Sequence, residues 1–387
     1  MVDRNKGRKW LVHLSADDWW RSNPHSRYHF TEQFYLAGYS VIWVNPLGLR
    51  FPSIRKQYFL RKILSKVKSI LVWSRKIKPD FYVLSPVFVP LYKKGFAERL
   101  NTTLVYGQLR LLCKAVKAKQ LNLFVTLPSF APLVRRLQAR KLAGKVIYYY
   151  SDLYNEYREI RDRETINAWD QELQASADSI YCASKTILKS IPEEIRSRKI
   201  VRVVDHQVDF DRFDYLKLQP SPLSIPRPII GYFGTLTDSN DWDMIEYAAL
   251  SKPEWSFVFV GRKLIDLPNL KHLSNIHFLG FIGYERLPSV AVNFSIGIMF
   301  WKMTPWIKAC SPLKLKEYLA LGLPVVSVPI EEVATKYREY VEIATDGPTF
   351  VEAVGRCVGK APMRSHRDFA SQFSWERAAK QIISESL

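Results

Sequence analysis

Short apolar runs that alternate with segments of helical periodicity constrain the fold of this chain more than any other feature. Continuous apolar runs are typical of strands buried on both faces, and strands separated by helices form parallel sheets. In the first half, the expected strands are residues 10–15, 40–44, 81–84, 121–126, 145–150, 179–182 and 200–204. The expected helices between them include residues 26–37, 96–117 and 164–175. The first half therefore predicts a parallel sheet covered by helices.

A proline-rich segment separates this series from a second one. Residues 214–228 carry four prolines within nine residues, which is typical of an interdomain linker. The expected strands after it are residues 229–233, 256–260, 276–279, 295–300 and 324–328, with helices at 241–250 and 312–321. We expect a first domain at 1–213, a linker at 214–228, a second domain at 229–365 and a closing segment at 366–387. The predicted class is α/β, with two doubly wound domains facing a central cleft and ligands bound beyond the carboxyl ends of the strands.

The positive charge is concentrated in the first half. The formal net charge is +20, and residues 1–150 hold 28 Lys and Arg against 6 Asp and Glu. The densest stretch, residues 51–78, has nine basic residues and no acid, and its apolar residues recur mostly every three or four positions. This pattern predicts a basic amphipathic helix that suits the surface of an anionic membrane. An ordinary domain helix with a solvated basic face is the alternative. Nucleic acid is not an expected partner, because no recognition motif accompanies the charge.

Cysteine usage and hydropathy indicate the compartment. The four cysteines form no CxxC pair, so neither a disulfide framework nor a cysteine zinc site is expected. The longest charge-free stretches, such as residues 287–301, are shorter than the roughly 18 residues of a membrane span. The first 20 residues lack the apolar core of a secretory signal. We therefore expect a cytoplasmic protein, peripherally associated with the inner face of the cell membrane.

The segment CSPLKLKEYLALGLPVVS, at 310–327, carries the clearest chemical signal. Ser311 suits a helix N-cap and Pro312 suits the first turn. Lys314 and Glu317 lie three residues apart and project from neighbouring positions of the helix. The free N–H groups of the first turn, the Ser311 hydroxyl and the Lys314 ammonium together predict an anion site. An ordinary capped helix with a surface Lys–Glu pair is the alternative, and this segment alone does not decide between them.

A wider pattern resembles a known family. The motifs GYFGTL (231–236), WSFVFVG (255–261), NIHFLG (275–280), YERLP (284–288) and SIGIMF (295–300) precede SPLKLKEYLALGLPVVS (311–327) in that order. This order resembles the nucleotide-binding half of GT-B glycosyltransferases, above all bacterial family-4-like enzymes of polysaccharide assembly. The match covers about 100 residues well, and FSWERAAKQI (373–382) is similar to the closing helix of those enzymes, which crosses back to the first domain. The resemblance implies two Rossmann-like domains and a nucleotide-sugar donor.

The resemblance also implies roles for particular residues. Gly234 and Thr235 would approach the donor diphosphate, and Arg262 or Lys314 would neutralise it. Backbone around Phe281 and Ile282 would hold the base, and Glu317 the ribose. The donor-binding set is then Gly234, Thr235, Arg262, Phe281, Ile282, Ser311, Pro312, Lys314 and Glu317. The chain departs from the pattern at Ala309, where retaining enzymes commonly carry a second glutamate, so the retaining assignment is in doubt.

The first domain supplies the candidate base. The sequence also resembles the membrane-associated glucuronosyltransferase of xanthan assembly, and this draws attention to Asp152, which follows the strand expected at 145–150. A carboxylate there could accept the proton of an acceptor hydroxyl in an inverting transfer. The alternative is a loop or capping residue.

Residues of the first loop and the next helix could touch the acceptor. They are Ser15, Asp17, Asp18, Arg27 and His29. Asp18 is a reserve base. For His29, the alternative is a helix histidine with a satisfied partner.

Two DxD triplets, at 209–211 and 241–243, could in principle hold a divalent cation. Both fit a turn or a helix start, so neither a metal nor another cofactor is expected. The predicted function is transfer of a sugar from a UDP donor to a lipid-linked saccharide in bacterial surface polysaccharide synthesis. A nucleotide-sugar epimerase of the same architecture and a non-enzymatic module that binds nucleic acid or membranes are the alternatives.

Overall fold

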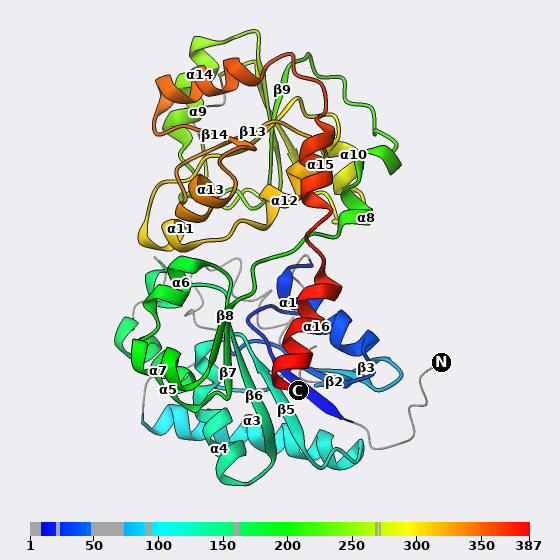
Figure 1. Cartoon of the computed structure of the whole chain (residues 1–387), viewed down its shortest axis with the longest axis vertical. Coiled ribbons are helices and arrows are strands. Elements are labelled where there is room, and N and C mark those ends of the chain that lie inside the picture. The colour runs from blue at the N-terminus through cyan, green and yellow to red at the C-terminus, as the bar shows by residue number, and fades with distance from the viewer. Residues whose placement is uncertain are drawn as a thin grey trace. The chain divides into compact units, whose positions relative to one another are not determined.

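The structure is a computed structural model that describes residues 9–20, 24–47, 73–89, 95–157, 162–267, 270 and 272–387. The chain forms two compact units (Figure 1). The first comprises Met1–Val204 and Ala378–Leu387, and the second comprises Asp205–Arg377. None of the described helices is both long enough and apolar enough to span a bilayer.

The first unit is built on an eight-stranded sheet in the order β3-β4-β2-β1-β5-β6-β7-β8. All its neighbouring strands pair in parallel except β3 and β4, which are antiparallel. The strands are β1 (Trp10–Leu14), β2 (Ser40–Val44), β3 (Ser74–Lys78), β4 (Phe81–Leu84), β5 (Leu121–Val125), β6 (Ala143–Tyr150), β7 (Ser179–Cys182) and β8 (Ile200–Val203). Its helices are α1 (Ser26–Leu36), α3 (Phe96–Ala115), α4 (Ala131–Ala139), α5 (Arg163–Ser176), α6 (Lys185–Ser190), α7 (Glu193–Arg198) and part of α16 (Trp375–Ser386).

Side-chain alternation along β6 shows why both faces of this sheet are covered. Tyr149 packs against Phe30 of α1, with ring centroids 4.9 Å apart. Its neighbour Tyr148 points to the opposite face and donates a 2.5 Å hydrogen bond to Asp170 of α5. Adjacent residues of a strand face opposite sides, so α1 and α5 cover opposite faces of the sheet. The apolar runs of the sequence are thus buried on both sides, as predicted.

The prediction of a helix across residues 51–78 is wrong for residues 74–78, the part of this segment that forms a strand. Residues 51–72 lie outside the described residues, but 74–78 form strand β3, which pairs antiparallel with β4. Arg75 and Lys76 are exposed there. An edge strand tolerates such charges because one of its sides has no neighbouring strand.

The second unit is built on a six-stranded parallel sheet in the order β11-β10-β9-β12-β13-β14. The strands are β9 (Ile229–Phe233), β10 (Ser256–Val260), β11 (Ile276–Gly280), β12 (Ile296–Met299), β13 (Val325–Ser327) and β14 (Val341–Ile343). The helices are α8 (Phe210–Phe213), α9 (Trp242–Ser251), α10 (Leu287–Ala291), α11 (Pro305–Ala309), α12 (Leu313–Ala320), α13 (Glu331–Lys336), α14 (Gly347–Cys357) and α15 (Arg364–Ala370). α9 packs beside α14, and α12 packs beside α15 (Figure 1). This sheet and its helices enclose one continuous apolar core.

The boundary between the units lies at Val204, not at the predicted residue 213. Asp205 is anchored in the second unit by ion pairs to Lys316 and Lys336. Phe213 is fully buried in the second core. Buried contacts of this kind, which no local pattern reveals, place residues 205–213 with the second unit. At the other end, 366–377 also belong to the second unit, and only Ala378–Leu387 group with the first.

Candidate functional site

The loops that follow β9 and β10 meet backbone to backbone at the carboxyl edge of the second sheet. Gly234 has φ +143° and Gly261 has φ +153°, a region that side chains rarely adopt. A Cβ atom on Gly261 would lie 1.8 Å from the carbonyl oxygen of Gly234. Position 261 therefore requires glycine. At Gly234 and Gly261 the two loops present only backbone at this edge of the sheet.

The Lys314 side chain extends from the first turn of α12 to the Gly234 loop. Its Nζ atom is 3.0 Å from the hydroxyl of Tyr232 and 4.4 Å from the ring centroids of both Tyr232 and Trp301. A Cβ atom on Gly234 would lie 3.0 Å from Nζ. The ammonium is thus held by two aromatic faces directly beside the Gly234 loop, an arrangement in which cation–π attraction fixes its position.

The start of α12 differs from the prediction for Ser311. Pro312, not Ser311, occupies the N-cap position, and no side chain caps the helix. Ser311 is buried and donates its hydroxyl hydrogen bond to Asp205 instead. The Ser311 hydroxyl can either donate to the carboxylate or accept from a backbone N–H as an N-cap. It donates to the carboxylate because a hydrogen bond to a charged acceptor is the stronger of the two. No side chain therefore caps the N–H groups at the start of α12, the helix from which Lys314 projects.

Glu317 lies one turn further along α12, with only 4% of its surface exposed. Its Oε1 atom accepts a 3.3 Å hydrogen bond from the Tyr284 hydroxyl. Burial raises the pKa of Glu317 to about 7, although Lys314 and the Tyr284 hydrogen bond act in the opposite direction. The surface Lys–Glu pair that the sequence allowed as an alternative is excluded, because Glu317 is buried and Lys314 is only partly exposed.

The other predicted donor residues follow the carboxyl ends of β9, β10 and β11. Arg262, after β10, places its guanidinium 4.5 Å from the ring centroid of Phe281, after β11. Both are exposed, as is Thr235, whereas Ile282 packs partly against the core. The structure therefore places these predicted donor residues at one edge of the sheet, whereas the Ser311 side chain is bound to Asp205.

Three aromatic residues of this site are missing from the predicted set. Tyr232 lies inside the GYFGTL motif, Trp301 follows a predicted strand, and Tyr284 begins the YERLP motif. Their position at strand ends is the signal that could have found them. Their contacts with Lys314 and Glu317 depend on residues far along the chain.

In the first unit, Asp152 belongs to a buried network centred on Arg27. Asp152 follows β6, and its Oδ2 atom is 2.7 Å from Arg27 Nη2 and 2.9 Å from the Ser151 hydroxyl. The Nη1 atom of the same guanidinium lies 3.3 Å from Asp17, in the loop after β1. Tyr154 lies 2.9 Å from Arg27 Nη2. Although burial lowers the pKa of Arg27, the neighbouring Asp17, Tyr154 and Asp152 raise it well above its usual value.

The remaining predicted acceptor residues take separate positions. Ser15 is fully buried, and its hydroxyl accepts a 3.0 Å hydrogen bond from the backbone N–H of Asp17. Asp18 accepts a 2.9 Å hydrogen bond from the backbone of Trp20. His29 packs edge-on against Tyr28. Among the residues predicted for the acceptor and the base, Arg27 is in contact with both Asp152 and Asp17.

The aspartates of the two DxD triplets serve local structure. Asp209 pairs with Arg212 at 2.9 Å, and Asp211 pairs with Lys217 at 2.5 Å. Asp241 caps α9 by accepting from the backbone N–H of Met244. Across the described ranges, no group of three or more His, Cys, Asp and Glu residues is arranged to hold a metal ion.

Solved structures of other proteins resemble the whole chain. A sucrose-phosphate synthase from Thermosynechococcus elongatus aligns at 12% identity with a TM-score of 0.72, covering 97% of this chain and 98% of that one. HepE of Anabaena in complex with UDP aligns at 11% identity and a TM-score of 0.64, with 98% and 99% covered. A UDP-forming trehalose-phosphate synthase from Burkholderia xenovorans aligns at 11% identity with a TM-score of 0.67. This alignment covers 98% of both chains. The chain has the GT-B fold.

Sequence comparison finds a relative that is named as a glycosyltransferase. TuaH of Bacillus subtilis (strain 168), named as a glycosyltransferase of teichuronic acid biosynthesis, is 29% identical over 251 residues. That match covers 61% of this chain and 62% of the relative, so it spans less than two thirds of either. No protein-family model matches the sequence.

Proposed function

We propose that this GT-B chain is a glycosyltransferase that moves a sugar from a UDP donor to a lipid-linked saccharide in bacterial surface polysaccharide synthesis. The observation that carries the proposal is the position of Lys314 Nζ beside the Gly234 loop, at the uncapped start of α12. An ammonium that projects from an uncapped helix start favours binding of a diphosphate. The relative's name and the UDP in the HepE structure support this interpretation.

The donor site uses each of its groups differently. Charge develops on the diphosphate as the bond from the sugar C1 to the phosphate oxygen breaks, and Lys314 with the α12 start would stabilise that charge. Glu317, one turn deeper, would accept hydrogen bonds from the ribose hydroxyls. The base would lie beside Phe281 and Ile282, under the Arg262 guanidinium.

The first unit would bind the acceptor and remove its proton. We assign the base to Asp152: the acceptor oxygen bonds to C1 of the sugar, UDP leaves, and the hydroxyl proton passes to the carboxylate. Arg27 would hold Asp152 in position. Ala309 ends α11 with 1% of its surface exposed, so the position where retaining enzymes commonly carry a glutamate has no carboxylate. We therefore propose transfer with inversion.

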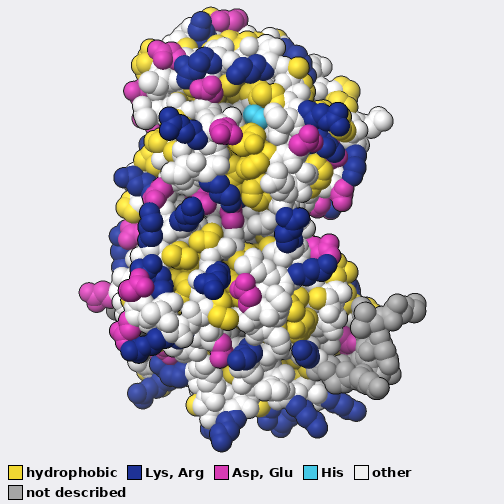
Figure 2. All heavy atoms as spheres, in the orientation of Figure 1, with side chains coloured by type: hydrophobic (Ala, Val, Ile, Leu, Met, Phe, Trp, Pro, Cys, Tyr) yellow, Lys and Arg dark blue, Asp and Glu magenta, His cyan; other side chains and the backbone are white. Residues whose placement is uncertain are grey.

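A described surface supports docking on an anionic membrane, independently of residues 51–72. On the outward face of α3, Phe96 is 81% exposed, Leu104 38% and Leu111 59%. Arg99 and Lys114 lie exposed on the same helix. Lys and Arg side chains gather along the edge of the first unit where α3 and α4 lie (Figure 2). Exposed apolar residues flanked by cations suit an interface with anionic lipid.

A panel of nucleotide sugars tests the donor proposal. Thermal melts of the full chain with UDP-sugars, GDP-sugars and UDP should show stabilisation by UDP compounds, because a ligand at 100 times its Kd adds about 2.7 kcal/mol to the free energy of unfolding. Lys314→Ala should remove the shift, whereas Lys308→Ala, an exposed lysine of α11, should keep it. No shift with any nucleotide sugar, or an unchanged shift in Lys314→Ala, would contradict the proposed site. Turnover of donor without acceptor would instead favour an epimerase.

A further inference from the structure

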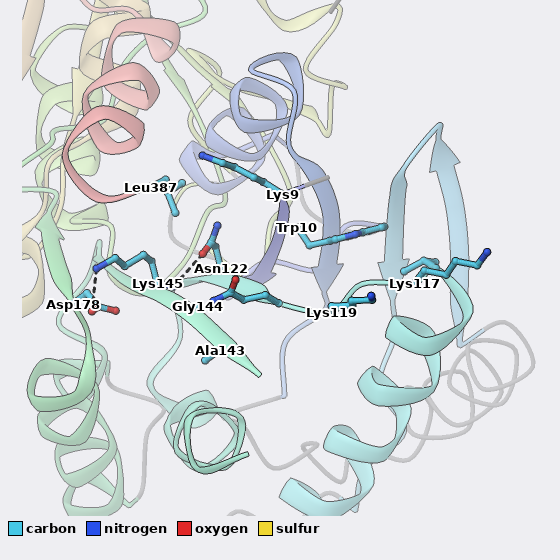
Figure 3. Close-up of a pocket in the computed structure, with 12 residues that line it drawn as sticks. Lys9, Trp10, Lys117, Lys119, Asn122, Ala143, Gly144, Lys145, Asp178 and Leu387 are labelled. Atoms are coloured by element: carbon cyan, nitrogen blue, oxygen red, sulfur yellow. Dashed lines mark hydrogen bonds and ion pairs between the residues drawn. The ribbon is translucent and has the colours of Figure 1, made fainter. Parts of the chain in front are cut away.

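A hollow of about 1,040 Å³ lies in the first unit, where β1, β5 and β6 begin. The lysines that line it include Lys9, Lys117 and Lys145, and their side chains point in different directions (Figure 3). Lys145 turns to Asp178, 3.7 Å away. An anion there would meet these charges one at a time. Polar groups that converge on one point lie in the second unit instead, beside Gly234.

Two polar atoms meet beside the backbone of Gly234. A Cβ atom on this glycine would lie 3.0 Å from Nζ of Lys314 and 3.0 Å from the hydroxyl oxygen of Tyr232. The two polar atoms are themselves 3.0 Å apart. The ammonium and the hydroxyl therefore flank the side of Gly234 that any other residue would fill. This point lies beyond the carboxyl end of β9, where ligands of doubly wound sheets bind.

The hydrogen atoms of these two groups lack acceptors. An ammonium carries three donors and no acceptor, so the Tyr232 oxygen accepts its hydrogen bond from Lys314. The hydroxyl hydrogen of Tyr232 and two hydrogens of Lys314 then remain to be donated elsewhere. No residue that the structure describes accepts a hydrogen bond from Tyr232, and none besides Tyr232 accepts one from Lys314. Three donor hydrogens thus lie together without an acceptor from the described chain.

Packing alone does not explain the Tyr232 hydroxyl. Tyr232 is 1% exposed, and its ring lies against Phe300 with centroids 5.0 Å apart. Phe259, its partner in register on β10, lies 5.6 Å from the same Phe300 ring and fills its place without a hydroxyl. A buried O–H that lacks an acceptor destabilises the folded state, so phenylalanine would suit the core better at position 232. A ligand oxygen supplies the acceptor that the core does not.

We propose that Tyr232 binds the donor diphosphate directly, by donating its hydroxyl hydrogen to a phosphate oxygen beside Lys314. The inference rests on the proposed function and adds a residue to its donor site. Phosphate oxygens are charged acceptors, and hydrogen bonds to them are about twice as strong as those between neutral groups. Negative charge on the diphosphate increases as the bond from the sugar C1 to the phosphate oxygen breaks. The same hydrogen bond therefore also stabilises the transition state.

Calorimetry with UDP tests the hydroxyl. Tyr232→Phe should weaken UDP binding by about 10- to 100-fold, because a hydrogen bond to a charged group is lost. Uridine, which lacks phosphate, should stabilise wild type and Tyr232→Phe equally in thermal melts. The matched control is Tyr149→Phe, which removes a buried hydroxyl that donates a 3.2 Å hydrogen bond to the Val204 carbonyl in the first unit. This control should bind UDP as wild type does.

Melting curves without ligand separate a binding role from a structural one. Tyr232→Phe should melt no lower than wild type, because its hydroxyl donates to no residue that the structure describes and water can replace it as acceptor for the partly exposed Lys314. Tyr149→Phe should melt lower, because the Val204 carbonyl loses its donor. A Tyr232→Phe protein that melts lower and binds UDP with wild-type affinity would assign the hydroxyl to structure and overturn the proposal.

Failure of this inference can be told from failure of the donor site. If wild type binds no UDP, or Lys314→Ala binds it fully, the donor site is refuted and the role of Tyr232 falls with it. If Lys314→Ala loses UDP binding while Tyr232→Phe keeps the wild-type affinity, the donor site stands and the inference is overturned. An equal loss of UDP and uridine binding in Tyr232→Phe would place the effect away from the diphosphate and also overturn it.

Discussion

Nη2 of Arg27 lies 2.7 Å from Oδ2 of Asp152, although the two residues come from the start of α1 and the end of β6. The same guanidinium holds Asp17 through its other terminal nitrogen. The planar Arg27 guanidinium thus holds the carboxylates of Asp17 and Asp152 together at the carboxyl edge of the first sheet. A lysine cannot replace it, because a single ammonium does not span both partners.

Arg27→Lys should therefore lower the transfer rate by about 10²-fold, since displacing a catalytic group by roughly 1 Å has an effect of this size. Asp152→Asn should abolish transfer, because the amide cannot accept the proton. Both variants should keep the wild-type affinity for UDP, whose proposed site is in the other unit. Single-turnover rates and calorimetry with UDP separate these effects. A wild-type rate in Asp152→Asn would remove that residue from the mechanism.

Glu317 should make the stability of the second unit depend on pH. The pKa of Glu317 rises from 4.5 to about 7 on folding, so the folded state binds more protons between these values. The free energy of unfolding then falls as pH rises through this range, by on the order of 3 kcal/mol for full burial. Glu317→Gln should be as stable as wild type near pH 4.5 and more stable at pH 8. Melting curves at both pH values check this, and a variant equally destabilised at both would contradict the assignment.

The same carboxylate should set the pH dependence of donor binding. If ribose hydroxyls donate to Glu317, the ionised form binds better, so UDP affinity should increase as pH rises through about 7. Glu317→Gln should bind UDP more weakly and without this dependence. Tyr284→Phe, which removes only the 3.3 Å hydrogen bond, should retain the dependence. Calorimetric titrations with UDP between pH 6 and 8 provide the measurement.

Local patterns predict the sheets well because most strands are apolar on both faces. The run SVIWV at 40–44 forms β2 with every residue buried. Strand β3 is not predicted because its sequence, SRKIK, lies at a sheet edge where charges are tolerated. Lys314 and Glu317 can be found because helical spacing links them within one segment.

Contacts between distant residues account for what the sequence does not predict. Ser311 has the features of an N-cap, but Asp205, more than a hundred residues earlier, takes its hydroxyl. The aromatic faces around Lys314 come from the ends of β9 and β12. Asp17 lies in a loop with other polar residues, and only the tertiary structure joins it to Arg27. The residue pattern of a single helix or strand predicts where it ends and which face is buried. The contacts between these distant residues instead depend on how the strands are ordered in the sheet.

The outward face of α3 should contribute to membrane binding through both its apolar and its basic residues. Leu111→Ser and Phe96→Ser each remove an exposed apolar side chain and should reduce vesicle binding without lowering the melting temperature, because neither is buried. Leu250→Ser, equally exposed on α9 of the second unit, is the matched control. Binding should also require phosphatidylglycerol and weaken with salt, as screened charges predict. Equal binding of all variants to neutral and anionic vesicles would contradict a docking role for α3.

Asp205 should stabilise the second unit and the start of α12 together. Its carboxylate lies 2.9 Å from Lys316 Nζ, which is 1% exposed, and 2.7 Å from Lys336 Nζ, which is 36% exposed. Burial alone would raise the pKa of Asp205, but Lys316 and Lys336 outweigh burial and hold it well below its usual value. Asp205→Asn would leave the buried Lys316 ammonium without the carboxylate that forms its 2.9 Å ion pair, and breaking such a pair costs about 3–5 kcal/mol.

We therefore expect Asp205→Asn to lower the melting temperature strongly and to weaken UDP binding, because Ser311 would then donate to a neutral amide oxygen in place of a carboxylate. Lys336→Gln is the control: its ammonium is partly solvated, so its loss should cost about 1 kcal/mol or less. In the pair Asp205→Leu with Lys316→Met, the buried charges are gone, and much of the stability should return. Melting curves of the four proteins decide the point. If Asp205→Asn melts like Lys336→Gln, the buried pair does not anchor this segment, and the position of α12 must depend on its apolar contacts alone.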